Sequence, residues 1–207
     1  MDKTTLLYAC RHGETTLNAS GCFRGTMNPP LNTNGREDAE QLADYFAPID
    51  LSAIFYSDKR RSEETAHVIA AKKPGIPCFG SSALHAWNVG KFSGQPKSPE
   101  NVQELECYVQ NPDIMVPNGE SLNEFKNRVR PCLMEGMELA NKAGKPVLFV
   151  VHSSIIHEIG TMIGGSHTTS LVKPGGIAQI YTNGCSLFSE PLYKPEPKPS
   201  ERAAQIS

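Results

Sequence analysis

Leu6-Leu-Tyr-Ala-Cys-Arg-His-Gly-Glu-Thr15 is a short apolar run that ends abruptly in polar residues, and the fold prediction starts from it. Its apolar part is typical of a strand that is covered on both faces. Polar groups at the carboxyl ends of such strands line ligand crevices in open α/β sheets, which makes Arg11 and His12 candidate site residues. Gly13 lets the backbone turn, and the residues through Asn18 can open a helical turn whose free N–H groups attract an anion. On this stretch alone, a phosphate site and a solvated strand end are equally good interpretations.

Two further strand ends carry residues of the same kinds. The continuous apolar run at 147–151 is best read as a central strand, and it delivers His152 at its end. A shorter run ends in Ser57-Asp58, which we expect to cap a helix that presents Arg61 near its start. We therefore predict that these groups gather with the first histidine and its arginine at one rim of the sheet.

Apolar residues at helical spacing predict helices between and after these strands. The expected helical segments are 35–46, the stretch from Arg61 to Ile69, 100–110, 121–141 with a kink at Pro131, and 155–163. Weaker strands are expected at 76–79, 177–182 and 186–188, the last two joined by a turn at Asn183-Gly184. This order predicts an α/β fold, a three-layer sandwich with a mostly parallel central sheet and helices on both faces.

The chain reads as one domain followed by a tail. Its 207 residues suffice for one substantial core and are few for two. We expect a single domain over 1–189, with an insertion-like lid at about 81–120 where glycines and prolines break short segments. The Pro-rich remainder, 190–207, cannot pack a core and is expected to be disordered. The lone tryptophan, Trp87, lies in the insertion, and we favour core packing over a place in a pocket wall.

Composition argues against several classes of partner. The formal net charge is −2 and the basic residues are dispersed, so no general field favours nucleic acid or an acidic membrane surface. We find no apolar run of membrane-spanning length and too few apolar residues near the N-terminus for a signal peptide. The six cysteines form no C-x-x-C pair and read as reduced thiols, which predicts a cytoplasmic protein. Any anion must therefore be held by a local cluster.

Five blocks of sequence, in order, carry polar residues at expected strand ends and loops. They are Arg11-His12-Gly13-Glu14-Thr15, Arg24 to Gly35, Ser57 to Ala66, Gly119-Glu120-Ser121-Leu122 and Val150 to Ser154. Together they resemble the histidine phosphatase superfamily, which includes the cofactor-dependent phosphoglycerate mutases, over about residues 5–183. The resemblance implies a phosphoglycerate mutase-like version of the sandwich. One block departs from the family, because Ser153 stands where a glycine is usual.

The resemblance also implies phosphate-binding roles. Arg11 belongs to the family signature, Asn18 lies where the family places a phosphate-contacting Asn, and Arg61 matches its second phosphate-binding Arg. Arg24 is a further candidate for phosphate contact, although a loop-bracing role competes more strongly there than at Asn18. Arg60 is adjacent on the expected helix but points about 100° away, so we expect it to be solvated.

The residue types suit phosphoryl transfer. A phosphomonoester is a dianion whose transfer needs cationic donors around three oxygens and an in-line nucleophile. Arg11, Arg61 and His152 suit the first task, since a guanidinium offers paired donors that match phosphate oxygens. His12 suits the second and would form a phosphohistidine that water hydrolyses, provided its other nitrogen donates to a backbone carbonyl near Gly13. The scheme needs no metal and no cofactor.

The proton donor is less clear. The family typically carries a Glu in a Leu-x-Glu pattern, but the matching segment here is Leu84-His85-Ala86, and alanine cannot deliver a proton. Glu120 is our first choice for a catalytic acid, with Asp58 as the rival. A helix N-terminus lowers the pKa of a carboxyl, which disfavours both. The hypothesis that follows is a preference for leaving groups that need little protonation.

The leading functional hypothesis is a phosphoric monoester hydrolase that acts on a small phosphorylated metabolite through His12. A phosphoglycerate mutase-type phosphotransferase is the nearer alternative, although mutases of this superfamily carry longer insertions. Because of Ala86, a catalytically weak phosphate-binding regulatory protein is a third reading. Specificity is expected to lie in the loops at about 81–120 and 166–176.

Overall fold

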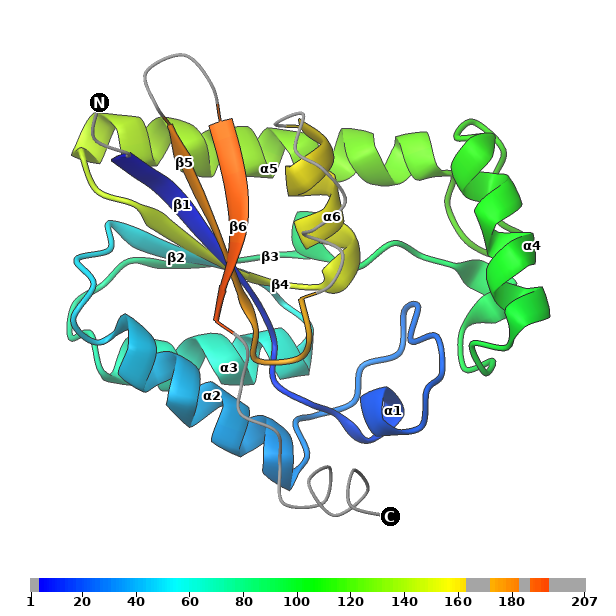
Figure 1. Ribbon diagram of the computed structural model, residues 1–207, viewed down its shortest axis with the longest axis horizontal. Helices are drawn as coiled ribbons and strands as arrows, with labels where there is room; N and C mark the ends of the chain where they lie inside the picture. The colour runs from blue at the N-terminus through cyan, green and yellow to red at the C-terminus, as the bar shows by residue number, and fades with distance from the viewer. Residues whose placement is uncertain (1–3, 163–171, 183–186, 194–207) are drawn as a thin grey trace.

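A six-stranded sheet forms the centre of the computed structural model, which describes residues 4–162, 172–182 and 187–193 (Figure 1). In sheet order the strands are β3 (Cys78–Ser81), β2 (Ala53–Ser57), β4 (Val147–Val151), β1 (Thr4–Arg11), β5 (Ile177–Thr182) and β6 (Leu187–Tyr193). The first four run parallel to one another, whereas β5 is antiparallel to both of its neighbours, β1 and β6. The sheet is therefore mostly parallel, as predicted.

Helices cover both faces of this sheet (Figure 1). On one face lie α2 (Thr33–Phe46) and α3 (Arg60–Ala71), and on the other lie α5 (Leu122–Ala143) and α6 (Ser153–Met162). Each face has its own apolar cluster, with Phe46 among the buried residues of the first and Phe125 among those of the second. The predicted three-layer α/β sandwich is confirmed.

Local sequence explains where the two longest helices begin. The side chain of Asn32 accepts a hydrogen bond from Gly35 N at 2.8 Å and caps α2. Ser121 and Glu124 form a capping box at the start of α5, and Gly144 ends that helix with φ at 65°. Apolar residues at helical spacing then bury one side of each helix against the sheet, which is where most of the helical stability arises.

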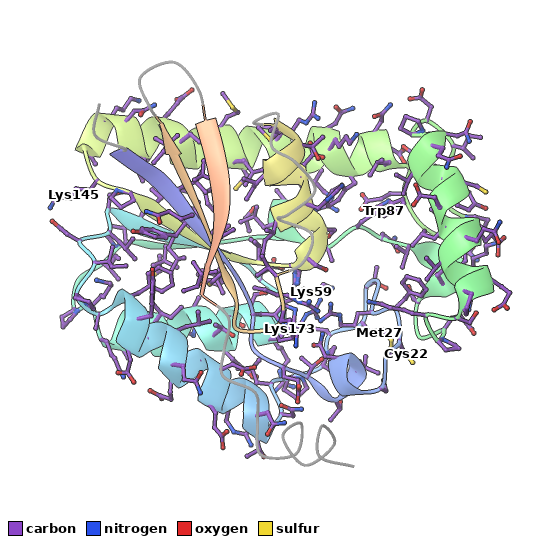
Figure 2. All side chains as sticks on the ribbon, in the orientation of Figure 1. Cys22, Met27, Lys59, Trp87, Lys145 and Lys173 are labelled. Atoms are coloured by element: carbon purple, nitrogen blue, oxygen red, sulfur yellow. The ribbon has the colours of Figure 1, made fainter. Side chains whose placement is uncertain are left out.

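The segment between β3 and α5 leaves the sheet. It contains two 3₁₀ turns, Ser82–Leu84 and Gly90–Phe92, and then α4 (Pro99–Gln110), which has no buried residue. Figure 1 shows α4 standing apart from the sheet, beyond the short helix α1 (Thr16–Ala19). In Figure 2, Trp87 lies on the stretch that leads from the sheet toward α4.

The sheet continues past residue 189, where the domain was predicted to end. Strand β6 continues to Tyr193 and pairs Pro191 with Ala178 of β5. A proline is tolerated there because β6 is an edge strand, which needs fewer backbone donors. The predicted turn at Asn183-Gly184, the end of the helix at 163 and the tail from 194 onward lie outside the described residues. Within the described part of the chain, no helix combines the length and apolar character needed to cross a membrane.

Candidate active site

The two parallel strands at the centre of the sheet bring two histidines to the same edge. Arg11 pairs with Val151 in the β1–β4 register, so the next residue of each chain segment leaves the sheet at one level. The backbone N–H of His12 donates to Val151 O at 3.1 Å. The rings of His12 and His152 are both buried, with centroids 5.2 Å apart. The predicted meeting of the two histidines is confirmed.

Gly13 fixes the orientation of the His12 ring. A Cβ at this position would lie 2.2 Å from Gly35 O, so the loop and the start of α2 approach too closely for a side chain. The carbonyl of Gly13 lies 2.7 Å from His12 Nδ1, and a carbonyl can only accept. Nδ1 therefore carries the proton, as predicted, and the lone pair lies on Nε2.

Arg61 faces that lone pair. Its Nε donates to His12 Nε2 at 3.1 Å, its Nη1 donates to Met27 O at 3.0 Å, and its Nη2 lies 3.4 Å from His152 Nδ1. The guanidinium comes from the first turn of α3 and is entirely buried. The prediction that Arg61 joins the histidines at the rim is confirmed, and the neighbouring Arg60 is exposed and pairs with Glu64.

Ser57 has a different task from the predicted one. Ser57 and Asp58 were expected to cap α3, but the helix N-cap is Lys59, whose side chain makes no capping bond and whose backbone N–H donates to Ser57 Oγ at 3.4 Å. The hydroxyl of Ser57 lies 2.9 Å from His152 Nε2 and fixes the orientation of that ring. Sequence reasoning placed Ser57 at a strand end and mistook its direction, because a serine that follows a strand suits a cap and a ligand equally well.

Arg24 reaches His12, whereas the side chain of Asn18 bonds to a neighbouring residue of the chain. Arg24 Nη1 lies 3.3 Å from His12 Nε2, although phosphate contact was predicted less strongly for Arg24 than for Asn18. Asn18 Oδ1 accepts from Thr15 N at 3.2 Å and from the Thr15 hydroxyl at 2.8 Å, which caps α1. The amide nitrogen of Asn18 is the group that could donate to a phosphate, and that contact stays a prediction.

Three arginines share this small space and repel one another. Burial, and then the charges of Arg24 and Arg61, lower the pKa of Arg11 to about 9. Burial, and then Arg24, lower the pKa of Arg61 to about 9, and burial lowers that of Arg24 to about 10. Arg11 Nε is buried and has no acceptor among the described residues. A dianion would supply that acceptor and relieve the repulsion.

The same environment keeps both imidazoles neutral. Burial lowers the pKa of His12 well below its usual value, and the charges of Arg61 and Arg24 add to the effect. Burial and Arg61 likewise lower the pKa of His152. A neutral imidazole with a fixed tautomer has a free electron pair at Nε2, which is the form that can attack phosphorus.

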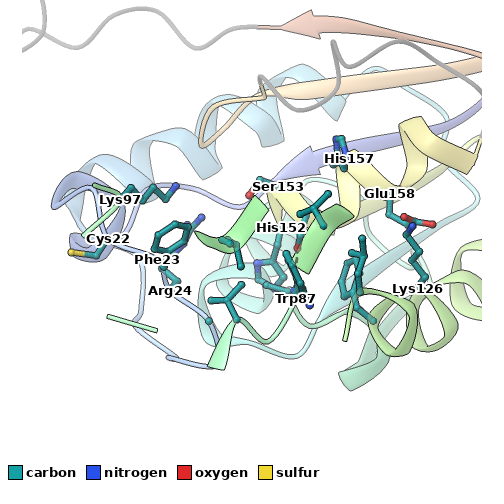
Figure 3. Close-up of a pocket in the computed structure, with 18 of the residues that line it drawn as sticks. Cys22, Phe23, Arg24, Trp87, Lys97, Lys126, His152, Ser153, His157 and Glu158 are labelled. Carbon is teal, nitrogen blue, oxygen red and sulfur yellow. Dashed lines mark hydrogen bonds between the residues drawn. The ribbon is translucent and has the colours of Figure 1, made fainter. Parts of the chain in front are cut away.

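A cavity of about 490 Å³ opens beside these groups (Figure 3). Arg24, Arg61, His152 and the first residue of α6, Ser153, line its polar side. Its apolar side is formed by Phe23, Val89, Leu105, Leu122, Phe125 and Trp87. Trp87 is only 8% exposed, so it both fills the core and walls the cavity, where the sequence reading favoured the core alone.

Glu120 is not placed as a proton donor would be. Its Oε1 accepts from Arg128 Nη2 at 2.6 Å and from Asn88 N at 2.9 Å, and its Oε2 lies 3.3 Å from Arg128 Nε. The carboxylate lines a second, shallower hollow and is not among the residues that line the cavity beside His152. Arg128 also donates to the carbonyls of Ala83 and His85. The pair therefore braces the loop that carries Ala86, and the structure does not support Glu120 as the acid.

The rival acid, Asp58, is also engaged, because it contacts His85 Nε2. A residue that the sequence reading missed is Lys97, which lines the cavity with its ammonium 5.6 Å from the ring centroid of Phe23. Burial, and then the charges of Arg24 and Arg11, lower the pKa of Lys97, so its ammonium lies in the electrostatic field of these arginines. No strand end or motif marked Lys97, because it lies in the irregular insertion.

Several known proteins are similar to this chain in sequence. A profile of the histidine phosphatase superfamily (branch 1) matches residues 7–173. An uncharacterized phosphatase of Bacillus subtilis, PhoE, is 29% identical over 163 residues, which are 78% of this chain and 78% of that protein. A probable phosphoglycerate mutase of Yersinia enterocolitica, GpmB, is 30% identical over 186 residues, 87% of this chain and 82% of that protein.

A solved structure extends the likeness to the fold. The crystal structure of phosphoglycerate mutase from Bacillus anthracis superposes with a TM-score of 0.75 over 90% of this chain and 91% of that one, at 24% identity. At that identity the likeness supports the architecture and not a shared substrate.

Proposed function

Since the chain belongs to the histidine phosphatase superfamily, we propose that it is a phosphatase that hydrolyses a small phosphomonoester through a phosphohistidine on His12. One observation carries the proposal. The unprotonated Nε2 of His12 faces two guanidinium donors, Arg61 Nε at 3.1 Å and Arg24 Nη1 at 3.3 Å. Such an arrangement holds a nucleophile and the charge-stabilising donors at one point.

The first step transfers the phosphoryl group to the protein. The ester phosphate takes the place between His12 and the guanidiniums, which then bind its equatorial oxygens. Nε2 attacks phosphorus, the ester P–O bond breaks, and the leaving oxygen keeps the electron pair. The Nδ1 proton stays on the ring and donates to Gly13 O, so the positive charge that develops on the ring is stabilised. A bound dianion raises the pKa of His152, whose Nδ1 would then donate to it.

Water completes the reaction. It attacks the phosphohistidine, the P–N bond breaks with its electron pair returning to Nε2, and inorganic phosphate leaves. Arg61, Arg24 and Arg11 stabilise the charge on the phosphoryl oxygens in both steps. This scheme draws each function from the chain's own residues.

Rapid mixing with phenyl phosphate, followed by acid-free digestion and mass spectrometry, tests the proposal. A phosphoryl group on His12 that forms before the steady state supports it. The His12→Asn variant keeps a similar shape and should show neither the label nor turnover. A regulatory, non-catalytic protein would bind phosphate without forming the label, and this result would overturn the proposal.

The mutase reading has the support of the relatives named phosphoglycerate mutase. It requires that the phosphohistidine be passed to an acceptor alcohol rather than to water. Incubation with 3-phosphoglycerate, with and without a bisphosphoglycerate primer, separates the two. We expect no formation of 2-phosphoglycerate with or without the primer, whereas its primer-dependent formation would favour the mutase.

A further inference from the structure

The cavity beside the phosphate-binding groups has walls of an unusual kind for a small polar metabolite. Phe23, Trp87 and Phe125 lie in them together with several aliphatic side chains, and Arg24, Arg61 and His152 line the same cavity. In Figure 3, Phe23 lies beside Arg24, and Trp87 lies beside His152. Aromatic and aliphatic walls bind an apolar body, and aromatic faces favour another ring.

Position 86 also borders this cavity, and it carries no proton donor. Among the described residues that line the cavity, the one carboxyl group is that of Glu158. It lies six residues after His152 on α6, about 9 Å along the helix axis. Its Oε1 accepts from Arg130 Nε at 2.7 Å, so this carboxylate is already paired with an arginine. Figure 3 shows it with Lys126 at the end of the cavity away from Arg24.

His152 also lines the cavity, and in the proposed function its Nδ1 donates to the bound phosphate and not to the leaving oxygen; Lys97, Lys126 and His157 do not replace a carboxylic acid either. Lys97 lies over the Phe23 ring and shares the field of Arg24 and Arg11, which suits a donor that binds an anion. Lys126 and His157 lie on α5 and beyond the first turn of α6. Outside the cavity, His85 and Asp58 contact each other, and His85 lines the shallower hollow.

We infer that the substrates are aryl phosphomonoesters, in which the phosphate is carried by a phenol with an apolar ring system. This inference rests on the proposed function and deepens it. A phenol ionises near pH 10, as a tyrosine side chain does, whereas an alkyl alcohol resembles water, which ionises about six units higher. A phenolate can therefore leave without a proton donor, and the aromatic walls hold its ring.

Atoms and electrons balance without a further reactant. The N–P bond forms as the P–O bond to the aryl group breaks, and the phenolate departs with the electron pair. Solvent then protonates the phenolate. Water supplies the oxygen and the protons of the inorganic phosphate when the phosphohistidine is hydrolysed.

A pair of esters with the same ring tests the inference. Phenyl phosphate and benzyl phosphate differ by one methylene, but only the first has a phenol as its leaving group. We expect kcat/KM for phenyl phosphate to exceed that for benzyl phosphate by at least 100-fold, and 2-naphthyl phosphate to exceed phenyl phosphate by about tenfold. Equal kcat/KM values for phenyl and benzyl phosphate would overturn the inference but would leave the proposed phosphatase function standing. No hydrolysis of either, with no label on His12, would overturn the proposed function as well.

A second and more specific test introduces an acid at position 86. Ala86→Glu is expected to raise kcat/KM for benzyl phosphate at least tenfold and to change that for phenyl phosphate less than threefold. Ala86→Gln has the same size but no acidic proton, and it should give no such rescue. If Ala86→Glu gives no selective gain while the wild type hydrolyses benzyl phosphate readily, another group already donates a proton. Lys97→Met and His85→Asn would then identify that donor by a loss confined to benzyl phosphate.

Discussion

Arg61 Nε lies 3.1 Å from Nε2 of His12, and the opposite ring nitrogen of that histidine lies 2.7 Å from Gly13 O. The two contacts give the imidazole opposite surroundings at its two nitrogens. The carbonyl holds the proton on one side, and the guanidinium excludes a proton from the other. The ring is thereby kept neutral among positive charges, which is the form that the proposed nucleophile requires.

Removal of the Arg61 charge should be costly. Arg61→Met takes away a donor that contacts His12, so we expect kcat/KM to fall about 100- to 1,000-fold, the usual loss for one preorganised donor. Arg60→Met is the matched control one residue away. Arg60 is exposed, and its change should leave kcat/KM within twofold. Similar losses in both variants would show that Arg61 acts through helix stability alone.

Inorganic phosphate should stabilise the folded protein. Burial lowers the pKa values of Arg11, Arg24 and Arg61, and neighbouring arginine charges add to the effect at Arg11 and Arg61, so these positive charges oppose folding until an anion binds. At 100 times the dissociation constant, phosphate should add about 2.7 kcal/mol to the free energy of unfolding. Thermal unfolding in phosphate and in chloride of equal ionic strength measures this. Arg24→Met should lose most of the gain, and an equal gain in chloride would speak against a phosphate site.

Acid should destabilise the fold through the two buried histidines. The pKa values of His12 and His152 are lowered in the folded state, so below about pH 6.5 the unfolded chain takes up protons that the folded chain does not. Stability is therefore lost as the pH falls from about 6.5 toward the folded pKa values, at up to about 1.4 kcal/mol per pH unit for each histidine. Denaturant unfolding at pH 7.5, 6.5 and 5.5 gives the slope. In His12→Asn the free energy of unfolding should change less steeply with pH, by up to about 1.4 kcal/mol per pH unit, which corresponds to one proton. An unchanged slope would contradict the argument that burial lowers the pKa of His12.

The bracing role of Glu120 predicts a loss of stability that does not depend on the substrate. Glu120→Gln breaks a partly buried pair with Arg128 and should lower the free energy of unfolding by about 1–3 kcal/mol. The ratio of phenyl to benzyl phosphate hydrolysis should stay as in the wild type. Arg128→Met should give a similar loss, with the double variant less than additive. A selective loss on benzyl phosphate in Glu120→Gln would reinstate Glu120 as the acid.

The part of the site that lies on strands was predictable from sequence. Arg11, His12 and His152 follow continuous apolar runs, and parallel strands place such residues at one edge of the sheet. Arg61 was predictable because it opens an amphipathic helix just after a strand. The same reasoning gave the three layers, since apolar periodicity decides which side of each helix is buried.

The part of the site that lies in loops was not predictable. Arg24 was a candidate only through the family resemblance, and Lys97 was missed, because no periodicity encodes the loop paths that bring them to the site. The contact of Ser57, at the end of β2, with His152 was missed as well. Glu120 was misjudged because its partner Arg128 lies eight residues away, where only the tertiary fold shows that they meet. Side-chain direction in irregular segments depends on contacts that are distant in sequence.

The most direct measurement is the position of the phosphoryl group on the trapped intermediate. ³¹P–¹H NMR of the phosphorylated protein, or of its His12 peptide, distinguishes attachment at Nε2 from attachment at Nδ1. The hydrogen bond from Nδ1 to Gly13 O predicts that the phosphoryl group is on Nε2 of His12. A phosphoryl group on Nδ1, or on another residue, would contradict the proposal that a fixed neutral tautomer of His12 is the nucleophile.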